Sequence, residues 1–490
     1  MDEFKASYAK GSLAVGAGVA ASVAAGFVSL YCLTRILEKE AFGGYGFAIS
    51  VVAIVTMFTT GGLERALLLK IGAGAGHHSE VAGGGLILKC LGASLVFSGL
   101  MVVAMILGGD ALVARGLTAS VGFWLPALAL TTVPITVNVL MRMWLQSNHR
   151  VPMSVILPGV TDVLRAVGLV LTLLFGLGLF GVVGAVYVSV VFALGILLIG
   201  AWSTVRWEPS TLTLSDFSNG VLYIPQKLVR QRFQQFDVLF LGMAASGAVI
   251  AEYLVAARMA QMCMMGSFAL SPSFSARARR LYVKDERAGL MQEYHLVRLS
   301  SLVVACGGAA AFAVLGQPLL SIFGSYGAAY GVLLILSASM VINMVTAIGP
   351  LLLTVTGAIR APTAVQMAGF AAFAASAVIM TPIYGSEGVA LAVLIGTAVK
   401  EIGLLILTYQ HFGRACLAPW SLGAVVVTAA ALGAGAAGML PPIATGGVVA
   451  LVTALAIMQD RHLAPFAQSV WSALSALVAK TGRALNSRGR

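Results

Sequence analysis

The chain alternates long apolar runs with short polar breaks along most of its length. Counting each run of about 20 apolar residues as one membrane-spanning helix predicts about fourteen spans. The approximate cores of these spans are residues 11–33, 45–63, 85–107, 121–144, 152–174, 180–202, 221–243, 249–273, 299–316, 329–356, 362–382, 387–411, 418–439 and 442–458. The fold class that this pattern predicts is an all-α polytopic membrane protein.

One of the predicted spans is charged, and it lies within residues 222–242 (LYIPQKLVRQRFQQFDVLFLG). By the positive-inside rule, the polar stretch 203–220 before it and the basic stretch 277–298 after it are both cytoplasmic, so an even number of crossings separates them. Residues 236–270 alone are too long for one span and provide only about half the apolar length of a second. The missing helical turns must therefore include Lys227 and Arg230.

The polar side chains of this span share one side of the predicted helix. At about 100° per residue, one sector contains Lys227, Arg230, Gln231, Gln234, Gln235 and Asp237. A span with its charges in one stripe turns that stripe away from lipid, towards protein or a water-filled cavity. We favour the cavity for Gln234 and Asp237, whereas the alternative for Lys227 and Arg230 is an amphipathic lead-in whose charges reach the cytoplasmic interface.

Composition agrees with a membrane protein and also indicates its orientation. Hydrophobic residues make up 59% of the 490 residues and charged residues only 10%, whereas soluble domains are about 25% charged. The net charge of +12 comes from basic residues in loops and tails, which indicates membrane orientation and anionic lipid rather than nucleic acid. The predicted outer loops carry only Arg35, Lys39 and Arg115, so we expect both termini to be cytoplasmic.

The two halves of the chain repeat weakly, with an offset of about 208 residues. Residues 33–48 align with residues 241–256 around a helix–short outer loop–helix turn, with Tyr45 opposite Tyr253. Six spans per half would run in the same direction and place a cleft between two lobes. The domains expected are an N-terminal six-helix lobe with a cytoplasmic linker (1–220), a C-terminal six-helix lobe (221–415), an additional helix pair (416–463) and a basic amphipathic cytoplasmic tail (464–490).

Sequence motifs for nucleotide and metal chemistry are missing. No G-x-x-x-x-G-K-[ST] occurs, so the chain contains no ATP-driven motor of that type. His77 and His78 lie in a glycine-rich inner loop without further ligands, and the five cysteines lie far apart, so neither group predicts a metal site. The outer loops are short and nearly uncharged, which argues against a membrane glycan polymerase or ligase. We expect a transporter without a cofactor and leave open a coupling ion, H+ or Na+.

Four stretches resemble a known family. LTRILEKEAFGGYGFAIS (33–50), followed by GLERAL (62–67), is similar to the first hairpin of bacterial polysaccharide exporters and O-antigen flippases of the multidrug/oligosaccharidyl-lipid/polysaccharide (MOP) superfamily. Residues 236–261 and 270–290 resemble further parts of these proteins. MTPIYGSEGVALAVLIG (380–396) looks like the family segment IPxYGxxGAAxA, with these residues in register: Thr381, Pro382, Tyr384, Gly385 and Gly388.

The resemblance implies a fold and an activity. The fold implied is two six-helix lobes around a central cavity, as in multidrug and toxin extrusion (MATE) proteins, plus two extra C-terminal helices. The activity implied is a flippase that works by alternating access in the bacterial cytoplasmic (inner) membrane. Its cargo would be an undecaprenyl-diphosphate-linked oligosaccharide, the repeat unit of an O-antigen, exopolysaccharide or other polysaccharide, moved from the inner to the outer leaflet. Its partners would be this lipid-linked glycan, membrane lipids, and polymerase or glycosyltransferase machinery.

Two other transport functions stay open. Lipid II flippases share the fold, but residues 11–31 contain no charge and so lack the Arg-rich pattern of their first helix. A MATE-type cation-coupled drug exporter would require acidic residues in its cavity, and acidic residues are scarce in these spans.

An anionic diphosphate that crosses a low-dielectric region needs fixed cations and hydrogen-bond donors to replace its water. The substrate-binding residues that we expect on this ground are Lys227, Arg230, Gln234, Arg258, Gln261 and Arg142. For Arg258 the alternative is a fixed salt bridge with Asp237 or Glu252. For Arg142 we favour an anchor at the membrane interface.

Four further charged residues are candidates for coupling transport to an ion gradient: Asp237, Glu252, Lys400 and Glu401. Lys400 and Glu401 are adjacent, so their side chains point about 100° apart and each needs a partner on another helix or water. Asp162 and Arg165 are spaced i, i+3 on the predicted span 152–174, and we expect them to form a structural pair with each other.

Overall fold

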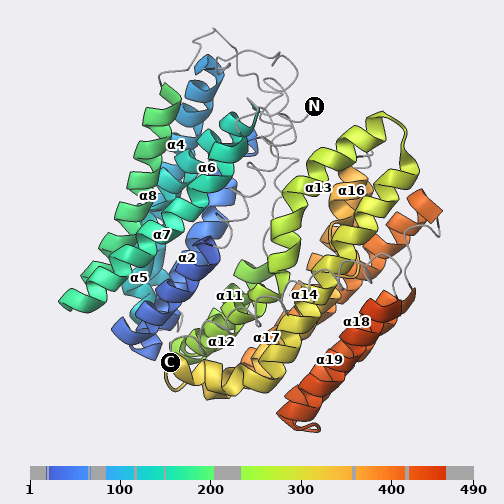
Figure 1. The fold of residues 1–490 in the computed structure, drawn as a ribbon. Helices are drawn as coiled ribbons and strands as arrows, with labels where there is room; N and C mark the ends of the chain where they lie inside the picture. The colour runs from blue at the N-terminus through green and yellow to red at the C-terminus, as the bar shows by residue number, and fades with distance from the viewer. Residues whose placement is uncertain are drawn as a thin grey trace, which may run out of the picture. The chain divides into compact units, whose positions relative to one another are not determined.

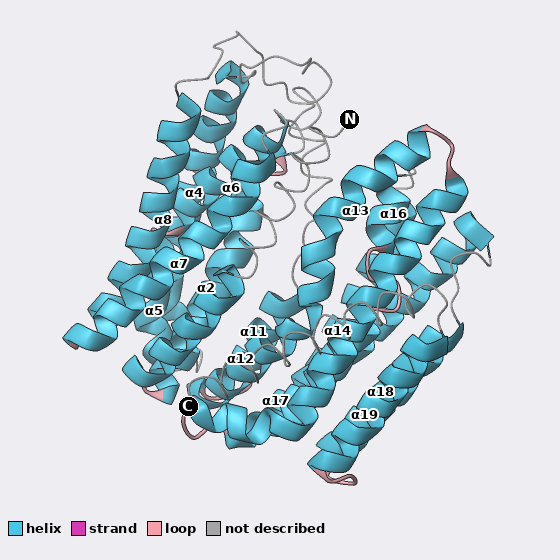
Figure 2. Cartoon of the chain, in the orientation of Figure 1, coloured by secondary structure: helices cyan, strands magenta, loops and turns pink. Residues whose placement is uncertain are grey.

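The structure is a computed structural model. It describes residues 21–64, 84–114, 119–147, 151–202, 233–355, 360–413 and 419–459, together with Gly18 and Leu67. Throughout these residues the chain forms helices joined by turns and loops (Figure 2). Lys227, Arg230 and the basic tail lie outside the described residues, as do His77, His78 and Cys416.

The chain divides into two compact units. The first comprises Met1–Met259, Gln317–Leu336 and Thr363–Lys400, and the second comprises Ala260–Gly316, Ser337–Pro362 and Glu401–Arg490. The lobe boundaries that the sequence predicts at residues 220 and 415 stay predictions.

The N-terminal part of the first unit is a bundle of long apolar helices, seen in blue and green in Figure 1. Its helices are Ala21–Ile36, α2 (Lys39–Thr59), α4 (Gly84–Ala114), α5 (Ala119–Ala129), α6 (Thr132–Ser147), α7 (Val151–Phe175), α8 (Gly178–Trp202), α11 (Phe233–Gly242) and α12 (Gly247–Ala260). The Tyr45 ring on α2 packs edge-on against the buried Trp124 of α5, with 5.3 Å between ring centroids. Aromatic and aliphatic side chains of this kind exclude water from the helix interfaces.

Helices of the remaining chain contribute to both units. They are η1 (Gln261–Met264), α13 (Met265–Val283), α14 (Arg287–Ile322), η2 (Gly327–Ala329), α15 (Tyr330–Ile342), α16 (Gly349–Val355), α17 (Arg360–Phe412), α18 (Pro419–Ala436) and α19 (Pro442–Gln459). In the second unit, the hairpin of α18 and α19 is attached to α14 by a hydrogen bond of 2.6 Å from Arg298 Nη2 to Ser421 Oγ. This hairpin lies within residues 416–463, and the assignment of that segment as an additional helix pair outside the two lobes stays a prediction.

Six helices in the described part of the chain are long and apolar enough to cross a membrane, and a seventh span results if the bent pair α5–α6 counts as one. Four further apolar helices are shorter: Ala21–Ile36, Gly327–Ile342, Ser421–Ala436 and Pro442–Leu455. These helices confirm the all-α polytopic class that the hydropathy pattern predicts. The number of about fourteen spans stays a prediction.

Two predicted spans are broken helices. The span expected at 121–144 bends by 49° between α5 and α6, and the span expected at 329–356 unwinds over residues 343–348, where Ala347 has a φ of 45°. Hydropathy averages over such breaks because the unwound residues are still mostly apolar. Unwound segments inside membrane proteins are tolerated where protein groups satisfy their backbone.

α17 contains two predicted spans, 362–382 and 387–411, separated at Gly385. This glycine has φ 56° and ψ −127°, a conformation that a residue with a Cβ rarely adopts. The sequence segment that resembles the IPxYG pattern therefore supplies the residue that lets the chain reverse between two helices.

The two hairpins of the predicted repeat pack against each other within the first unit. A Cβ placed on Gly43 of α2 would lie 1.8 Å from the carbonyl oxygen of Gly247, the first residue of α12. The second helices of the two hairpins begin at Lys39 and Gly247, and 247 − 39 = 208, the offset at which the two sequence segments align.

Candidate functional site

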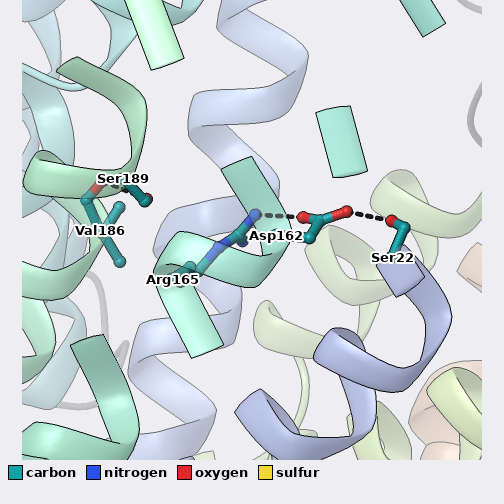
Figure 3. Close-up of polar contacts among 5 residues, drawn as sticks. All are labelled: Ser22, Asp162, Arg165, Val186 and Ser189. Carbon is teal, nitrogen blue, oxygen red and sulfur yellow. Dashed lines mark hydrogen bonds and ion pairs between the residues drawn. The ribbon is translucent and has the colours of Figure 1, made fainter. Parts of the chain in front are cut away.

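The centre of the candidate site is an ion pair on α7. Arg165 Nη2 donates to Asp162 Oδ1 at 2.6 Å, which confirms the predicted i, i+3 pair. Ser22, on the helix Ala21–Ile36, donates from Oγ to the second carboxylate oxygen, Oδ2 (Figure 3). The side chains of Arg165 and Asp162 expose 30% and 31% of their surface, so the pair is held on two sides but is not sealed.

Two more arginines act on the same carboxylate. Arg142 of α6 is half-buried and interacts electrostatically with Asp162 and with the buried Glu64. Arg258 of α12 is exposed and interacts with Asp162, with Asp237 and, by like-charge repulsion, with Arg165. We call Arg142, Arg165 and Arg258 together with Asp162 the arginine cluster.

The arginine cluster is supported by an aromatic residue of α2. Tyr45 lies close to Arg165 and within electrostatic range of Arg258. Because Tyr45 itself packs on Trp124, its hydroxyl is presented to the arginines from a ring that is fixed in the helix interface. The matching residue of the repeat, Tyr253 on α12, has a similar role towards another charged residue.

That residue is Asp237 of α11, which is 1% exposed. The Tyr253 hydroxyl donates to its Oδ2 at 2.7 Å, and the backbone N–H of Val238 donates to its Oδ1 at 2.6 Å. Both carboxylate oxygens are thus satisfied inside the protein, as buried polar groups generally are. Asp237 was expected among the coupling candidates, and the structure places it within electrostatic range of Arg258.

Glu252, the second coupling candidate, lies in a different contact. Lys39 Nζ lies 2.7 Å from Glu252 Oε1, donates to the carbonyl oxygen of Ser325 at 2.5 Å and sits 5.1 Å from the centroid of the Tyr326 ring. We call these four residues the outer clasp, because the sequence predicts that the turn preceding Lys39 is on the outer side. Burial, followed by the negative charge of Glu252, raises the pKa of Tyr326 to about 12.

Glu401, in the second unit, accepts hydrogen bonds from the unwound segment of a broken span. Its Oε2 accepts 2.5 Å and 3.2 Å hydrogen bonds from Oγ1 and the backbone N–H of Thr346, in the unwound segment 343–348. The Tyr294 hydroxyl donates to the carbonyl oxygen of the same threonine at 3.1 Å. Its sequence neighbour Lys400 belongs to the first unit, where its Cβ lies close to Gly369 of the other half of α17.

The remaining residues predicted to bind substrate lie on other elements than the arginine cluster or outside the described residues. Gln234 lies in the first turn of α11, Gln261 begins η1 in the second unit and is half-buried, and Lys227 and Arg230 lie outside the described residues. The structure therefore brings two of the six, Arg142 and Arg258, to one carboxylate. In the part of the chain that is described, no three His, Cys, Asp or Glu side chains gather as a metal site would require.

For Arg165 and Asp162, which lie at the centre of this site, the sequence interpretation favoured a structural role. Because the i, i+3 spacing lets the two side chains neutralise each other, the sequence offered no reason to assign them a role in substrate binding. The signal that marks them is their position, since ionisable residues in the middle of an apolar span usually line a pathway or a site.

Comparison with known proteins gives a family match and a set of solved structures with a similar fold. The family described as "Polysaccharide biosynthesis protein" matches residues 8–276, which is more than half of the 490 residues. No curated protein sequence matches the chain significantly.

Solved structures with a similar fold are transporters of the MOP superfamily. An inward-facing MATE multidrug resistance transporter is 15% identical with a TM-score of 0.64, covering 80% of this chain and 95% of its own. An outward-facing MATE transporter is 13% identical with a TM-score of 0.58, covering 82% and 95%. A MOP superfamily transporter from Pyrococcus furiosus, whose title describes a reversed polarity of its binding pocket, is 15% identical with a TM-score of 0.57, covering 83% and 95%. At these identities the likeness concerns the fold.

Proposed function

Because this chain belongs to the polysaccharide biosynthesis protein family of MOP transporters, we propose that it flips an undecaprenyl-diphosphate-linked oligosaccharide across the bacterial cytoplasmic membrane. The protein is a membrane transporter and not an enzyme, so the chemistry of the site is binding and release. The cargo would move from the inner leaflet to the outer leaflet, where polymerase machinery uses it.

The arginine cluster is the observation that carries this proposal. Arg165 of α7 pairs with Asp162, Arg142 of α6 and Arg258 of α12 lie within electrostatic range of it, and at least Arg165 and Arg258 are not fully buried. Arginine is suited to phosphate because its planar guanidinium offers paired donors and stays charged in a low-dielectric site. A diphosphate headgroup would find there the cations that replace its hydration shell.

The proposed transport cycle is alternating access between two six-helix lobes, with about fourteen spans in total and both termini in the cytoplasm. The outer clasp would close the path on the outer side while the site loads from within. The lipid tail would stay in the bilayer while the headgroup crosses between the lobes. The membrane potential or an ion gradient would provide the driving force, and Asp237, Lys400 and Glu401 stay candidates for coupling.

The proposal is tested by flipping in proteoliposomes that contain a fluorescent undecaprenyl-diphosphate oligosaccharide. We expect the double variant Arg165→Gln/Arg258→Gln to reduce the flipping rate at least about tenfold, because each charge-assisted hydrogen bond contributes roughly 1.5–3 kcal/mol. Lys227→Gln/Arg230→Gln tests the same role for the charged segment ahead of α11.

The matched control is Arg287→Gln, which removes an arginine whose side chain is 80% exposed in a surface pair with Asp285. This variant should flip at the rate of the unchanged protein. Full flipping by the Arg165→Gln/Arg258→Gln variant would contradict the proposal.

Cation-coupled drug export is the second candidate, because Asp237 and Glu401 are buried carboxylates at 1% and 2% exposure. Such an exporter would expel organic cations from inverted vesicles in response to a proton or Na+ gradient. The arginine cluster disfavours it, since three fixed cations repel a cationic drug. Cation efflux without any flipping of lipid-linked glycan would decide for this candidate and against the first.

A further inference from the structure

The carboxylates that interact electrostatically with the three arginines differ in how much of their side-chain surface is exposed. Glu64 and Asp237 are 3% and 1% exposed, whereas the Asp162 side chain exposes 31% of its surface. Both oxygens of Asp237 accept hydrogen bonds from groups of α11 and α12 that pack around it. Asp162 is therefore the carboxylate of this site that an incoming anion can reach.

Asp162 is held by contacts that can open without a backbone change. One partner, Arg165, lies a single turn further along the same helix, and the other, Ser22, is a hydroxyl on the neighbouring helix Ala21–Ile36. Rotation of two partly exposed side chains is enough to separate the pair. The two partners of Asp162, seen in Figure 3, approach its carboxylate from opposite ends.

The charge balance favours exchange when a more highly charged anion arrives. Arg165 and Arg258 repel each other, and both interact with the single negative charge of Asp162. Asp237 also acts on Arg258, but it is 1% exposed and stays in its own hydrogen bonds. A diphosphate carries at least two negative charges and more acceptor oxygens, so it neutralises both arginines better than a carboxylate does. When the diphosphate leaves, an uncompensated pair of arginines would be costly in a membrane span unless the carboxylate returns.

We propose that Asp162 is an exchangeable counter-ion, which occupies Arg165 in the empty transporter, yields it to the anionic headgroup of the cargo, and recaptures it on release. The inference rests on the proposed function for the diphosphate chemistry of the cargo. Asp162 is then a positioning residue: it keeps the arginines charged, satisfied and in place, and it limits how tightly they hold the cargo.

The first test is binding of farnesyl diphosphate, a short-chain prenyl diphosphate that carries no glycan, to the full chain in nanodiscs of zwitterionic lipid. Asp162→Asn removes the competitor while keeping the size of the side chain. We expect the dissociation constant to fall about tenfold, which corresponds to ~1.4 kcal/mol. Asp162→Glu, which keeps the charge, should bind like the unchanged protein.

The control for the change in formal charge is Glu293→Gln, which removes the carboxylate of a surface pair with Arg277 in the second unit. It should leave the affinity for farnesyl diphosphate unchanged. A folded Asp162→Asn variant whose affinity is unchanged or weaker would overturn the inference.

If Asp162→Asn does not fold, Ser22→Ala takes its place. This change removes one donor from the carboxylate and makes Asp162 easier to displace, so we expect farnesyl diphosphate to bind about two- to threefold more tightly. Affinity equal to that of the unchanged protein would then overturn the inference.

Transport kinetics separate the counter-ion from a merely structural role. For Asp162→Asn we expect a lower KM together with a lower maximal flipping rate, because cargo binds tightly and leaves slowly, and we expect Asp162→Glu to restore both. A structural defect would lower the rate without lowering KM, and that result would overturn the inference.

The two proposals fail in different ways. Tighter binding by Asp162→Asn, in a protein whose unchanged form flips no lipid-linked glycan, supports the counter-ion and removes the proposed function. If the unchanged protein flips lipid-linked glycan normally and Asp162→Asn changes neither affinity nor KM, the proposed function is supported and the counter-ion role is removed.

Discussion

Hydrogen bonding separates the intramembrane acids into two kinds. Asp237 and Glu401 are almost fully buried, and each accepts two hydrogen bonds from protein groups. Asp162 and Glu252 are partly exposed and each pairs with a cation. At the scale of the residue, the first kind stabilises a fixed arrangement and the second kind suits contacts that form and break during transport.

Tyr326 gives a prediction about pH at the outer clasp. Its pKa is about 12 in the folded protein against an ordinary value of 10.0, because burial and the charge of Glu252 disfavour the phenolate. A pKa raised by folding means that the contribution to stability is complete below pH 10 and is lost as the pH rises through about 12. The ultraviolet absorbance of phenolate, measured as the difference between the unchanged protein and Tyr326→Phe, should follow this higher pKa. A difference curve centred near 10.0 would contradict it.

Helix contacts in this protein depend on where the backbones can approach each other. α2 meets the start of α12 at Gly43 and Gly247, where any side chain on Gly43 would overlap a carbonyl oxygen. This close approach brings together the second helices of the two predicted hairpins, which carry Tyr45 and Tyr253. At the scale of the element, the repeat therefore produces two matched positions, each with a tyrosine that supports a charged residue.

Replacing Gly43 tests this contact directly. Gly43→Ala puts a Cβ 1.8 Å from the Gly247 carbonyl oxygen, so the helices must move apart. We expect a loss of about 1–3 kcal/mol of stability, the usual range for overpacking, read as a lower Tm. Gly92→Ala on α4 is the matched control, because nothing lies within 4 Å of the added Cβ and alanine favours the helix by roughly 1 kcal/mol. An equal Tm for the two variants would argue against the tight contact.

The outer clasp concerns the molecule as a whole, because it joins residues far apart in the chain. Lys39 belongs to the expected lobe 1–220, while Glu252 and Ser325 belong to the expected lobe 221–415. In an alternating-access cycle these contacts would have to open each time the site faces outward. Arg35, near the end of the preceding helix Ala21–Ile36, adds a 3.0 Å hydrogen bond to the Ile322 carbonyl oxygen at the same end.

Weakening the outer clasp should shift the transporter towards outward opening. In a background without the five natural cysteines, we expect a cysteine introduced as Ser325→Cys to react faster with an external, impermeant maleimide when Lys39→Ala is added. One ion pair and one cation–π contact together contribute roughly 0.5–1 kcal/mol, so the increase should be about two- to fivefold. Arg287→Ala, at an exposed pair, should leave the labelling rate unchanged, and an unchanged rate with Lys39→Ala would count against the clasp.

The sequence by itself determined what depends on local pattern. Apolar runs predicted the all-α membrane class, the i, i+3 spacing predicted the pair of Asp162 and Arg165, and the offset of about 208 aligned the two hairpins whose second helices are α2 and α12. These features follow from helix periodicity and from the cost of exposing backbone to lipid, both of which act between neighbouring residues.

Only the tertiary structure decided which charges meet. Arg142 and Arg258 lie within electrostatic range of the partly exposed Asp162. Glu252 pairs with Lys39, and Glu401 accepts a hydrogen bond from the backbone of an unwound span. No linear pattern encodes these choices, because a charge within an apolar helix can be neutralised by any helix that packs beside it. Interhelical packing selects among those partners, and in this protein it brings Arg142 and Arg258 within electrostatic range of the pair of Asp162 and Arg165.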